Sequence, residues 1–265
     1  MEHCLLVERN DRNVITLTLN RPAQHNALDR ALIKAFSAEM KAIARDTDLR
    51  IVILTGIGKS FCSGADLKQM GLAQECDEVI RTKALELASM MANLYALPQA
   101  TIARVNGPAF GGGLGLIACC DFAIATTEAR FAFTETRLGL VPAIIAPYVI
   151  NAMGARQAKK YFLSADIIDA ERALTIGLVD RVVDHKHLDE ALCERVEDLL
   201  RAGPRAVAEC KRLVDTIVPI TPETVQYTAE INAKVRASPE GRDGLAAFLE
   251  KRDPHWRNIM KQARP

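Results

Sequence analysis

A run of three glycines, Gly111-Gly112-Gly113, could bind an oxygen that becomes negatively charged during a reaction. The run follows an apolar segment typical of a strand, residues 102–105, and precedes a helix-like segment that begins near Leu114. Glycines leave the backbone bare, and the first N–H groups of a helix have no acceptor inside it. The sequence therefore predicts amide donors at this turn. A tight turn that only lets a helix pack against a sheet explains the run equally well.

The same run also fits a dinucleotide-binding loop. Gly113, Gly115 and Ala118 match the G-x-G-x-x-G/A spacing, and Glu135 lies about where such a site has the acid that binds a ribose. That loop follows the first strand of a βαβ unit, however, and here roughly a hundred residues precede it. The dinucleotide interpretation is the weaker one.

A second glycine segment follows residues 51–55, an apolar run typical of a buried strand. It reads Phe61-Cys62-Ser63-Gly64-Ala65-Asp66-Leu67. Further motifs are Asn20-Arg21-Pro22, Asn26-Ala27-Leu28, Asn106-Gly107, Cys120-Asp121 and residues 131–142. Taken in chain order with the Gly111-Gly112-Gly113 run, these motifs resemble those of the crotonase superfamily of enoyl-CoA hydratases and isomerases. The resemblance extends from about Val14 to Trp256.

The resemblance implies an α/β protein with the ββα spiral core of the crotonase (ClpP/crotonase-like) fold and a C-terminal helical trimerisation region. Arg201-Ala202-Gly203-Pro204 is a candidate hinge. We therefore expect a core over residues 1–200 that holds the active site, and a helical cap over 201–265. The family also implies self-association into homotrimers, often paired into hexamers.

By the resemblance, the backbone amides of Ala65 and Gly112 form an oxyanion hole. They would hold the thioester carbonyl as it becomes an enolate, and each donor is worth roughly 10²–10³ in rate. Glu135 matches the family's second catalytic glutamate. Its phenylalanine and leucine neighbours would raise its pKa by desolvation, which suits a group that takes and gives protons. The alternative is a surface carboxylate paired with Arg137, which would lower the pKa.

The chain departs from the family pattern at Gly115, where two-glutamate hydratases carry the first glutamate. A single glutamate either performs both proton transfers of hydration or serves a reaction without water, as in the resembling Δ3,Δ2-enoyl-CoA isomerases. A residue as small as Gly115 would also make room for a substituent at C3 of the acyl group.

The segment from Leu140 to Tyr148 replaces the glycine-rich Pro-Gly-x-Gly-Gly-Thr run of straight-chain hydratases. It resembles bacterial hydratases of branched glutaconyl-CoA esters, 3-methylglutaconyl-CoA or its isohexenyl homologue, in leucine or acyclic terpene breakdown. Arg137 or a nearby cation would meet the free carboxylate of such a substrate. An Arg137 that is partnered on the surface explains its presence as well.

The remaining contacts to coenzyme A follow the same register. Nucleotide and pantetheine contacts are implied for Arg21, Ala23, Ala65, Asp66, Leu67 and Lys68, with Gly111 and Gly115 also placed at the substrate. Lys68 is a candidate phosphate partner. Phe248 and Lys251 match residues that commonly reach the CoA of a neighbouring subunit.

Composition excludes several other classes of function. The net charge of +1 gives no broad attraction to nucleic acid or an acidic membrane. Seven cysteines without a C-x-x-C pair favour reduced thiols, and Cys62 is interpreted as a packed thiol. His185 and His187 lie in a polar turn without further metal ligands nearby. No export signal or membrane span is recognised, so we expect a cytoplasmic protein without a metal.

Several elements must position these residues. Alternating apolar residues predict a strand over 14–19, and Asp29 is a candidate N-cap for the helix that follows. A helix is predicted over about 79–94, with strands at 102–105 and 122–125. Beyond residue 151 helical patterns dominate, at 155–163, 169–176, 188–199, 204–218, 222–237 and 241–251.

Together these features predict an enoyl-CoA hydratase that adds water across the 2,3 double bond of a 2-enoyl-CoA thioester. No cofactor is expected, because CoA is part of the substrate. Glu135 would take a proton from the water that attacks C3. The first alternative is an isomerase, in which Glu135 moves a proton from C2 to C4 of a 3-enoyl-CoA. The second is a non-catalytic protein that binds CoA esters.

Overall fold

The computed structural model describes residues 3–71, 76–217 and 220–254. Its larger sheet has the strand order β1-β2-β3-β4-β6-β9, in which β1 is antiparallel to β2 and the other neighbours are parallel. The strands are β1 (Leu5–Arg9), β2 (Val14–Leu19), β3 (Ile51–Gly56), β4 (Ala100–Val105), β6 (Phe122–Thr126) and β9 (Arg181–Val183). Strand β3 is buried along its whole length, as its continuous apolar run requires.

A smaller sheet, in the order β5-β7-β8, brings the catalytic candidates together. It comprises β5 (Ala109–Phe110), β7 (Arg130–Ala132) and β8 (Ile168–Asp169). Strand β5 is parallel to β7, with Ala109 opposite Phe131 and Phe110 opposite Ala132. The glycine run that follows β5 and the residues that follow β7 therefore leave the sheet at the same edge.

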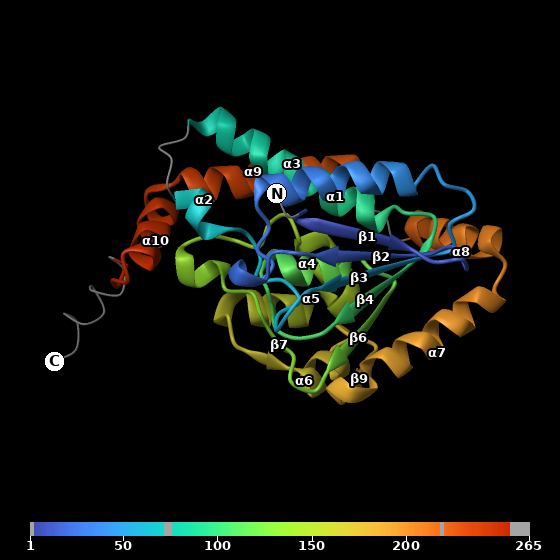
Figure 1. The fold of residues 1–265 in the computed structure, drawn as a ribbon. Helices are drawn as coiled ribbons and strands as arrows, with labels where there is room; N and C mark the ends of the chain where they lie inside the picture. The colour runs from blue at the N-terminus through green and yellow to red at the C-terminus, as the bar shows by residue number, and fades with distance from the viewer. Residues whose placement is uncertain (1–2, 72–75, 218–219, 255–265) are drawn as a thin grey trace.

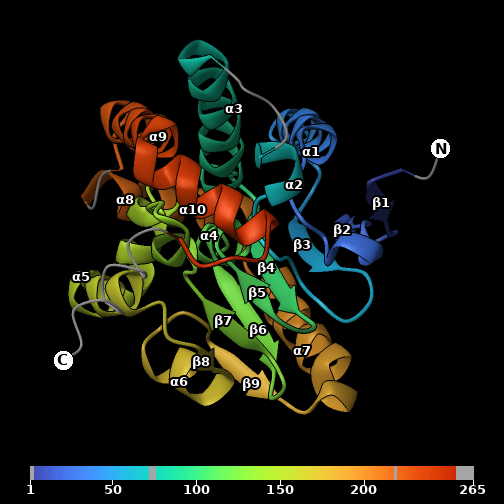
Figure 2. The same ribbon diagram turned by 90° about the vertical axis from the view of Figure 1, so that its left-hand side faces the viewer.

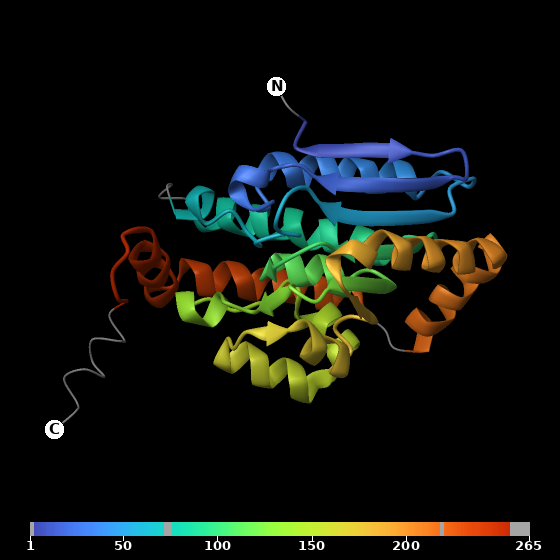
Figure 3. The same cartoon turned by 60° about the horizontal axis from the view of Figure 1, so that its bottom comes forward.

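Helices cover the larger sheet on both faces. Figure 1 shows α1 (Arg30–Ile43), α3 (Asp77–Tyr95) and α9 (Pro222–Ala237) on one side, and α7 (Leu188–Arg201) on the other. Helix α1 buries Leu32, Phe36, Met40 and Ile43, whose helical spacing gives one apolar face. Figure 3 shows β1 to β3 along one edge of the molecule.

The C-terminal helices do not stand apart from the rest. The other helices are α2 (Leu67–Gly71), α4 (Gly112–Ala118), α5 (Ala146–Ser164), α6 (Ala170–Thr175), α8 (Pro204–Ile217) and α10 (Pro239–Leu249). Helix α9 packs against α3, and α10 lies beside α2 (Figure 2). The expected cap over 201–265 thus has extensive contact with the core, and its last eleven residues lie outside the described part.

The predicted elements are confirmed, with one difference in helix α5. The side chain of Asp29 accepts from the Leu32 amide at 2.8 Å and caps α1 as expected. Helix α5 begins at Ala146, earlier than the predicted 155, and is interrupted at Gly154, whose φ is +77°. The prediction captured only the part after this break. In the described residues no helix has the length and apolar character needed to cross a membrane.

Candidate active site

The two glycine segments lie against each other. The Phe61 amide donates to the Pro108 carbonyl at 3.0 Å, and the Phe110 amide donates to the Cys62 carbonyl at 2.9 Å. Cys62 and Ala109 form a parallel bridge between them. These bonds join the loop after β3 to the loop after β4. The two motifs recognised in the sequence therefore form one surface.

The amides of Ala65 and Gly112 are neighbours on this surface. A Cβ built on Gly112 would lie 3.9 Å from the Ala65 nitrogen. Gly64 adopts a φ of +87°, and a Cβ there would approach the Phe110 carbonyl oxygen to 2.7 Å, so only glycine suits the turn. Across the described part of the chain, neither amide has a hydrogen-bond acceptor. Two adjacent unused donors are what an oxyanion hole requires.

The carboxyl group of Glu135 lies beside the same loop. Glu135 opens the 3-10 turn η2 (Glu135–Leu138), just after β7, whose pairing with β5 places it there. A Cβ built on Gly111 would lie 3.1 Å from Glu135 Oε1, and Gly111 has a φ of +48°. Glycine at 111 thus allows the carboxyl group to sit next to the amide of Gly112.

Burial raises the pKa of Glu135 into the range that suits an acid–base catalyst. Its Oε2 is buried and has no hydrogen-bond partner in the described structure. Phe133, fully buried, packs edge-on against Phe162 nearby. Desolvation raises the pKa of Glu135 to about 7. The alternative of a surface carboxylate paired with Arg137 is wrong, because Oε2 is buried and the described residues show no ion pair between Glu135 and Arg137.

A cleft of about 960 Å³ contains most of the residues expected to bind coenzyme A. Predicted residues that line it are Ala23, Ala65, Asp66, Leu67, Lys68, Arg137, Phe248 and Lys251. Its volume is in the range of ligand-binding clefts. Lys68, Arg137 and Lys251 are exposed there, so an anionic ligand could reach all three. Phe248 and Lys251 line the cleft of their own chain, whereas the resemblance implied the CoA of a neighbouring subunit.

Arg21, a predicted CoA contact, binds three acceptor groups of the protein itself. It is not among the residues that line this cleft. Its guanidinium donates to Asp29 at 3.1 Å, to Asp66 at 3.0 Å and to the carbonyl of Ala27. The sequence suggested that Arg21 contacts CoA, but it could not reveal these partners within the chain.

The room expected at Gly115 is absent. A Cβ built there would lie 2.2 Å from Ile145 Cγ2 and 3.2 Å from Met91 Cε. The position faces packed hydrophobic side chains and not a free space for a substrate substituent. This corrects the expectation that Gly115 contacts the acyl group.

Sequence reasoning missed a second cavity, of about 110 Å³, on another side of Ala65. The apolar residues that line it are Leu28, Ile33, Ala65, Met70, Ala84, Leu87 and Ile144, and the cationic ones are Arg30, Lys83 and Arg236. Arg236 is only 8% exposed and donates to the Met70 carbonyl at 3.1 Å. Lys83 lies on α3 and Arg236 on α9, so no local motif marks them. The cavity shares Ala65 and Asp66 with the larger cleft, which makes it a candidate acyl pocket.

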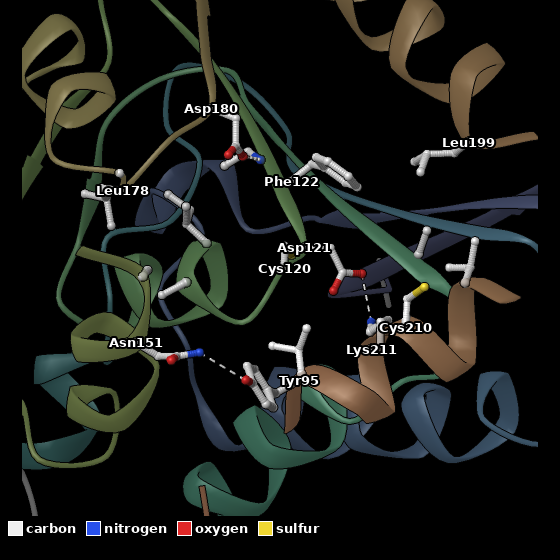
Figure 4. A pocket seen from close by; sticks show the side chains of 18 of the residues that line it. Tyr95, Cys120, Asp121, Phe122, Asn151, Leu178, Asp180, Leu199, Cys210 and Lys211 are labelled. Atoms are coloured by element: carbon white, nitrogen blue, oxygen red, sulfur yellow. Dashed lines mark hydrogen bonds and ion pairs between the residues drawn. The ribbon is translucent and has the colours of Figure 1, made fainter. Parts of the chain in front are cut away.

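A further cavity, of about 620 Å³, lies away from these residues (Figure 4). In it, Lys211 Nζ donates to Asp121 at 2.7 Å and to the Gln99 carbonyl at 3.0 Å. Asp121 also accepts from the Thr101 amide at 2.8 Å. The Asp121 of the Cys120-Asp121 motif thus ties β4 to α8. None of the predicted catalytic or CoA-binding residues lines this cavity.

Other candidate chemistries are not supported. Cys62 is completely buried and its pKa is raised to about 12 by desolvation, so it is a packed thiol as predicted. His185 and His187 are exposed, as expected for a solvated turn. The described residues contain no cluster of His, Cys, Asp and Glu that could hold a metal ion.

The fold and this arrangement are those of a crotonase-type enzyme. The sequence matches the enoyl-CoA hydratase/isomerase family over residues 9–259. It is 31% identical over 255 residues to the 2,3-dehydroadipyl-CoA hydratase of Escherichia coli, covering 96% of this chain and 98% of that protein. It is 30% identical over 263 residues to the mitochondrial methylglutaconyl-CoA hydratase of Mus musculus, covering 95% of this chain and 82% of that protein.

A solved structure agrees with these relatives. The crystal structure of an enoyl-CoA hydratase from Mycobacterium avium has a TM-score of 0.84 to this chain at 33% identity, covering 97% of this chain and 100% of that one. The chain belongs to the enoyl-CoA hydratase/isomerase family of the crotonase superfamily. It is an enzyme of the hydro-lyase class that acts on CoA thioesters.

Proposed function

We propose that the protein hydrates a branched glutaconyl-CoA thioester, 3-methylglutaconyl-CoA or its isohexenyl homologue, with Glu135 as its only acid–base carboxylate. The observation that carries the proposal is the buried Glu135 carboxyl beside Gly111, next to the unused amides of Ala65 and Gly112. The amides hold the thioester oxygen as charge develops on it. Glu135 takes a proton from water while the hydroxide adds to C3, and the proton is then delivered to C2.

The lining of the second cavity supports an acyl group that ends in a carboxylate. Its lining includes three cationic side chains, Arg30, Lys83 and Arg236, of which Arg30 pairs with Glu86. The two relatives described above are named for thioesters of dicarboxylic acids, adipic and glutaconic. Arg137, the cation suggested by the sequence, lines the larger cleft instead.

The test is product analysis in ¹⁸O-water. Wild type and Glu135→Gln are incubated with 3-methylglutaconyl-CoA, crotonyl-CoA and a 3-enoyl-CoA, and the product masses are measured by mass spectrometry. A labelled water adduct on the branched ester, lost in Glu135→Gln, is the expected result. An adduct on crotonyl-CoA alone would reject the glutaconyl substrate. Turnover that survives in Glu135→Gln would reject the single-carboxylate mechanism.

Isomerisation is the second candidate, because Ile145 leaves no space for a second carboxylate at position 115. One carboxylate suffices to move a proton from C2 to C4 of a 3-enoyl-CoA. A double-bond shift without a gain in mass would identify this reaction.

We also propose a cytoplasmic enzyme that self-associates into trimers or hexamers through residues 201–265. Large apolar side chains that are exposed in the single chain support this: Leu213 and Val214 on α8, and Phe248 on α10. Analytical ultracentrifugation would measure the assembly. A monomer at micromolar concentration would reject it.

A further inference from the structure

Arg21 binds three groups on two segments of the chain next to Ala65. Its Nη2 lies 3.0 Å from Asp66 Oδ2 and 3.1 Å from Asp29 Oδ2, and its Nη1 donates to the Ala27 carbonyl. All three side chains are largely buried, with 14% of Arg21, 12% of Asp29 and 11% of Asp66 exposed. A guanidinium fork can hold several acceptors in fixed directions at once.

These partners flank the bridge that holds Ala65. The Leu28 amide donates to the Gly64 carbonyl at 2.7 Å, and the Asp66 amide donates to the Leu28 carbonyl at 3.1 Å. Leu28 and Ala65 thereby form a parallel bridge. Arg21 binds the residue just before Leu28 and the residue just after Ala65. It thus fixes both sides of the bridge from which the Ala65 amide projects.

The charge of Arg21 also decides whether this arrangement can persist. The carboxylates of Asp29 and Asp66 approach the same nitrogen, so they lie close together in a poorly solvated place. Without the cation they would repel each other and move apart. Because Asp66 adjoins Ala65, this movement would displace the Ala65 amide.

We propose that Arg21 is a positioning residue for the reaction, which aligns the Ala65 amide with the thioester oxygen and makes no contact with CoA. The inference rests on the proposed oxyanion role of Ala65. It also predicts that lysine cannot replace Arg21, since an ammonium group lacks the planar fork that spans three acceptors.

The test compares a CoA thioester with its N-acetylcysteamine analogue, which lacks the nucleotide and all phosphates. Arg21→Lys and Arg21→Gln should lower kcat by about 10–100-fold on both thioesters, with KM changed by less than about 3-fold. Arg12→Gln, which breaks an exposed ion pair with Glu197, is the matched control and should leave kcat unchanged. The thermal unfolding curve of each variant gives the fraction that is folded at the assay temperature.

A second readout does not depend on turnover. The enolate of a bound acetoacetyl thioester absorbs in the near ultraviolet and reports charge stabilisation at the oxyanion hole directly. The Arg21 variants should weaken this band, whichever acyl substrate the enzyme uses. A loss of kcat/KM on the CoA thioester alone, with KM raised and kcat unchanged, would overturn the proposal. So would a loss of kcat that only matches the unfolded fraction, or an enolate band equal to that of the wild type.

Discussion

Ile145 fills the space that a side chain at position 115 would need. A Cβ built on Gly115 lies 2.2 Å from Ile145 Cγ2, and Ile145 itself is only 3% exposed. Gly115 lies on α4, and Ile145 immediately precedes α5, which packs against α4. Because these two segments pack so closely, position 115 has no space for a carboxylate side chain.

Gly115→Ala should destabilise the fold. Overpacking a buried site costs about 1–3 kcal/mol, and the better helix propensity of alanine, about 1 kcal/mol, offsets part of it. We expect a net loss of up to about 2 kcal/mol in the free energy of unfolding, measured in urea. The double variant Gly115→Ala/Ile145→Ala, which removes the Cγ2 methyl group that would meet the new Cβ, should lose less than the sum of the two single changes. Additive losses would show that the two side chains do not compete for space.

The rate of hydration should follow the ionisation of Glu135. Its carboxylate form takes the proton from water, and its pKa is raised to about 7. We expect kcat/KM to rise about tenfold for each pH unit below 7 and to level off above it. A solvated glutamate would instead titrate near 4.5. A profile that is flat between about pH 5 and 8 would contradict the burial of this group.

The burial of Glu135 should lower the free energy of unfolding at high pH. The folded protein binds this proton more tightly than the unfolded chain does, so stability falls as pH rises from 4.5 to about 7 and stays lower above that. At about 1.4 kcal/mol for each pH unit, the full cost is about 3 kcal/mol. Glu135→Gln should therefore gain stability relative to wild type at pH 8 but not at pH 4. Equal urea midpoint differences at both pH values would contradict this prediction.

Arg236 and Arg137 should differ in their effect on an acid-ended substrate. Arg236→Gln removes a buried cation from the small cavity, while Arg137→Ala changes the exposed side of the larger cleft. Truncating one partner of a buried charge pair costs about 3 kcal/mol, or roughly 10²-fold in kcat/KM. We expect that loss for Arg236→Gln on 3-methylglutaconyl-CoA, with at most about a threefold loss on crotonyl-CoA.

Arg137→Ala serves as the comparison, since it tests the cation that the sequence suggested. It should raise KM modestly and equally for both esters if it only faces the CoA cleft. A selective loss of the glutaconyl reaction in Arg137→Ala would assign the carboxylate to Arg137 instead. Equal losses on both esters in Arg236→Gln would remove the small cavity from substrate recognition.

Local patterns explain why so much of the fold could be predicted. The apolar run of β3, the cap at Asp29 and the spacing of Leu32, Phe36 and Ile43 each depend on neighbours within a few residues. The prediction missed the part of α5 before Gly154. This glycine, with a φ of +77°, interrupts the helix, so the helical pattern could be recognised only after it.

The sequence by itself determined the family, the two glycine loops and Glu135, because each is a short motif whose residue types carry the chemistry. Only the tertiary structure decided what surrounds them: Ile145 beside Gly115, Asp29 and Asp66 around Arg21, and Arg236 in the small cavity. Apart from the Arg21–Asp29 pair, these contacts join residues far apart in the chain. They depend on how closely helices and loops pack, which no local spacing of residues can specify.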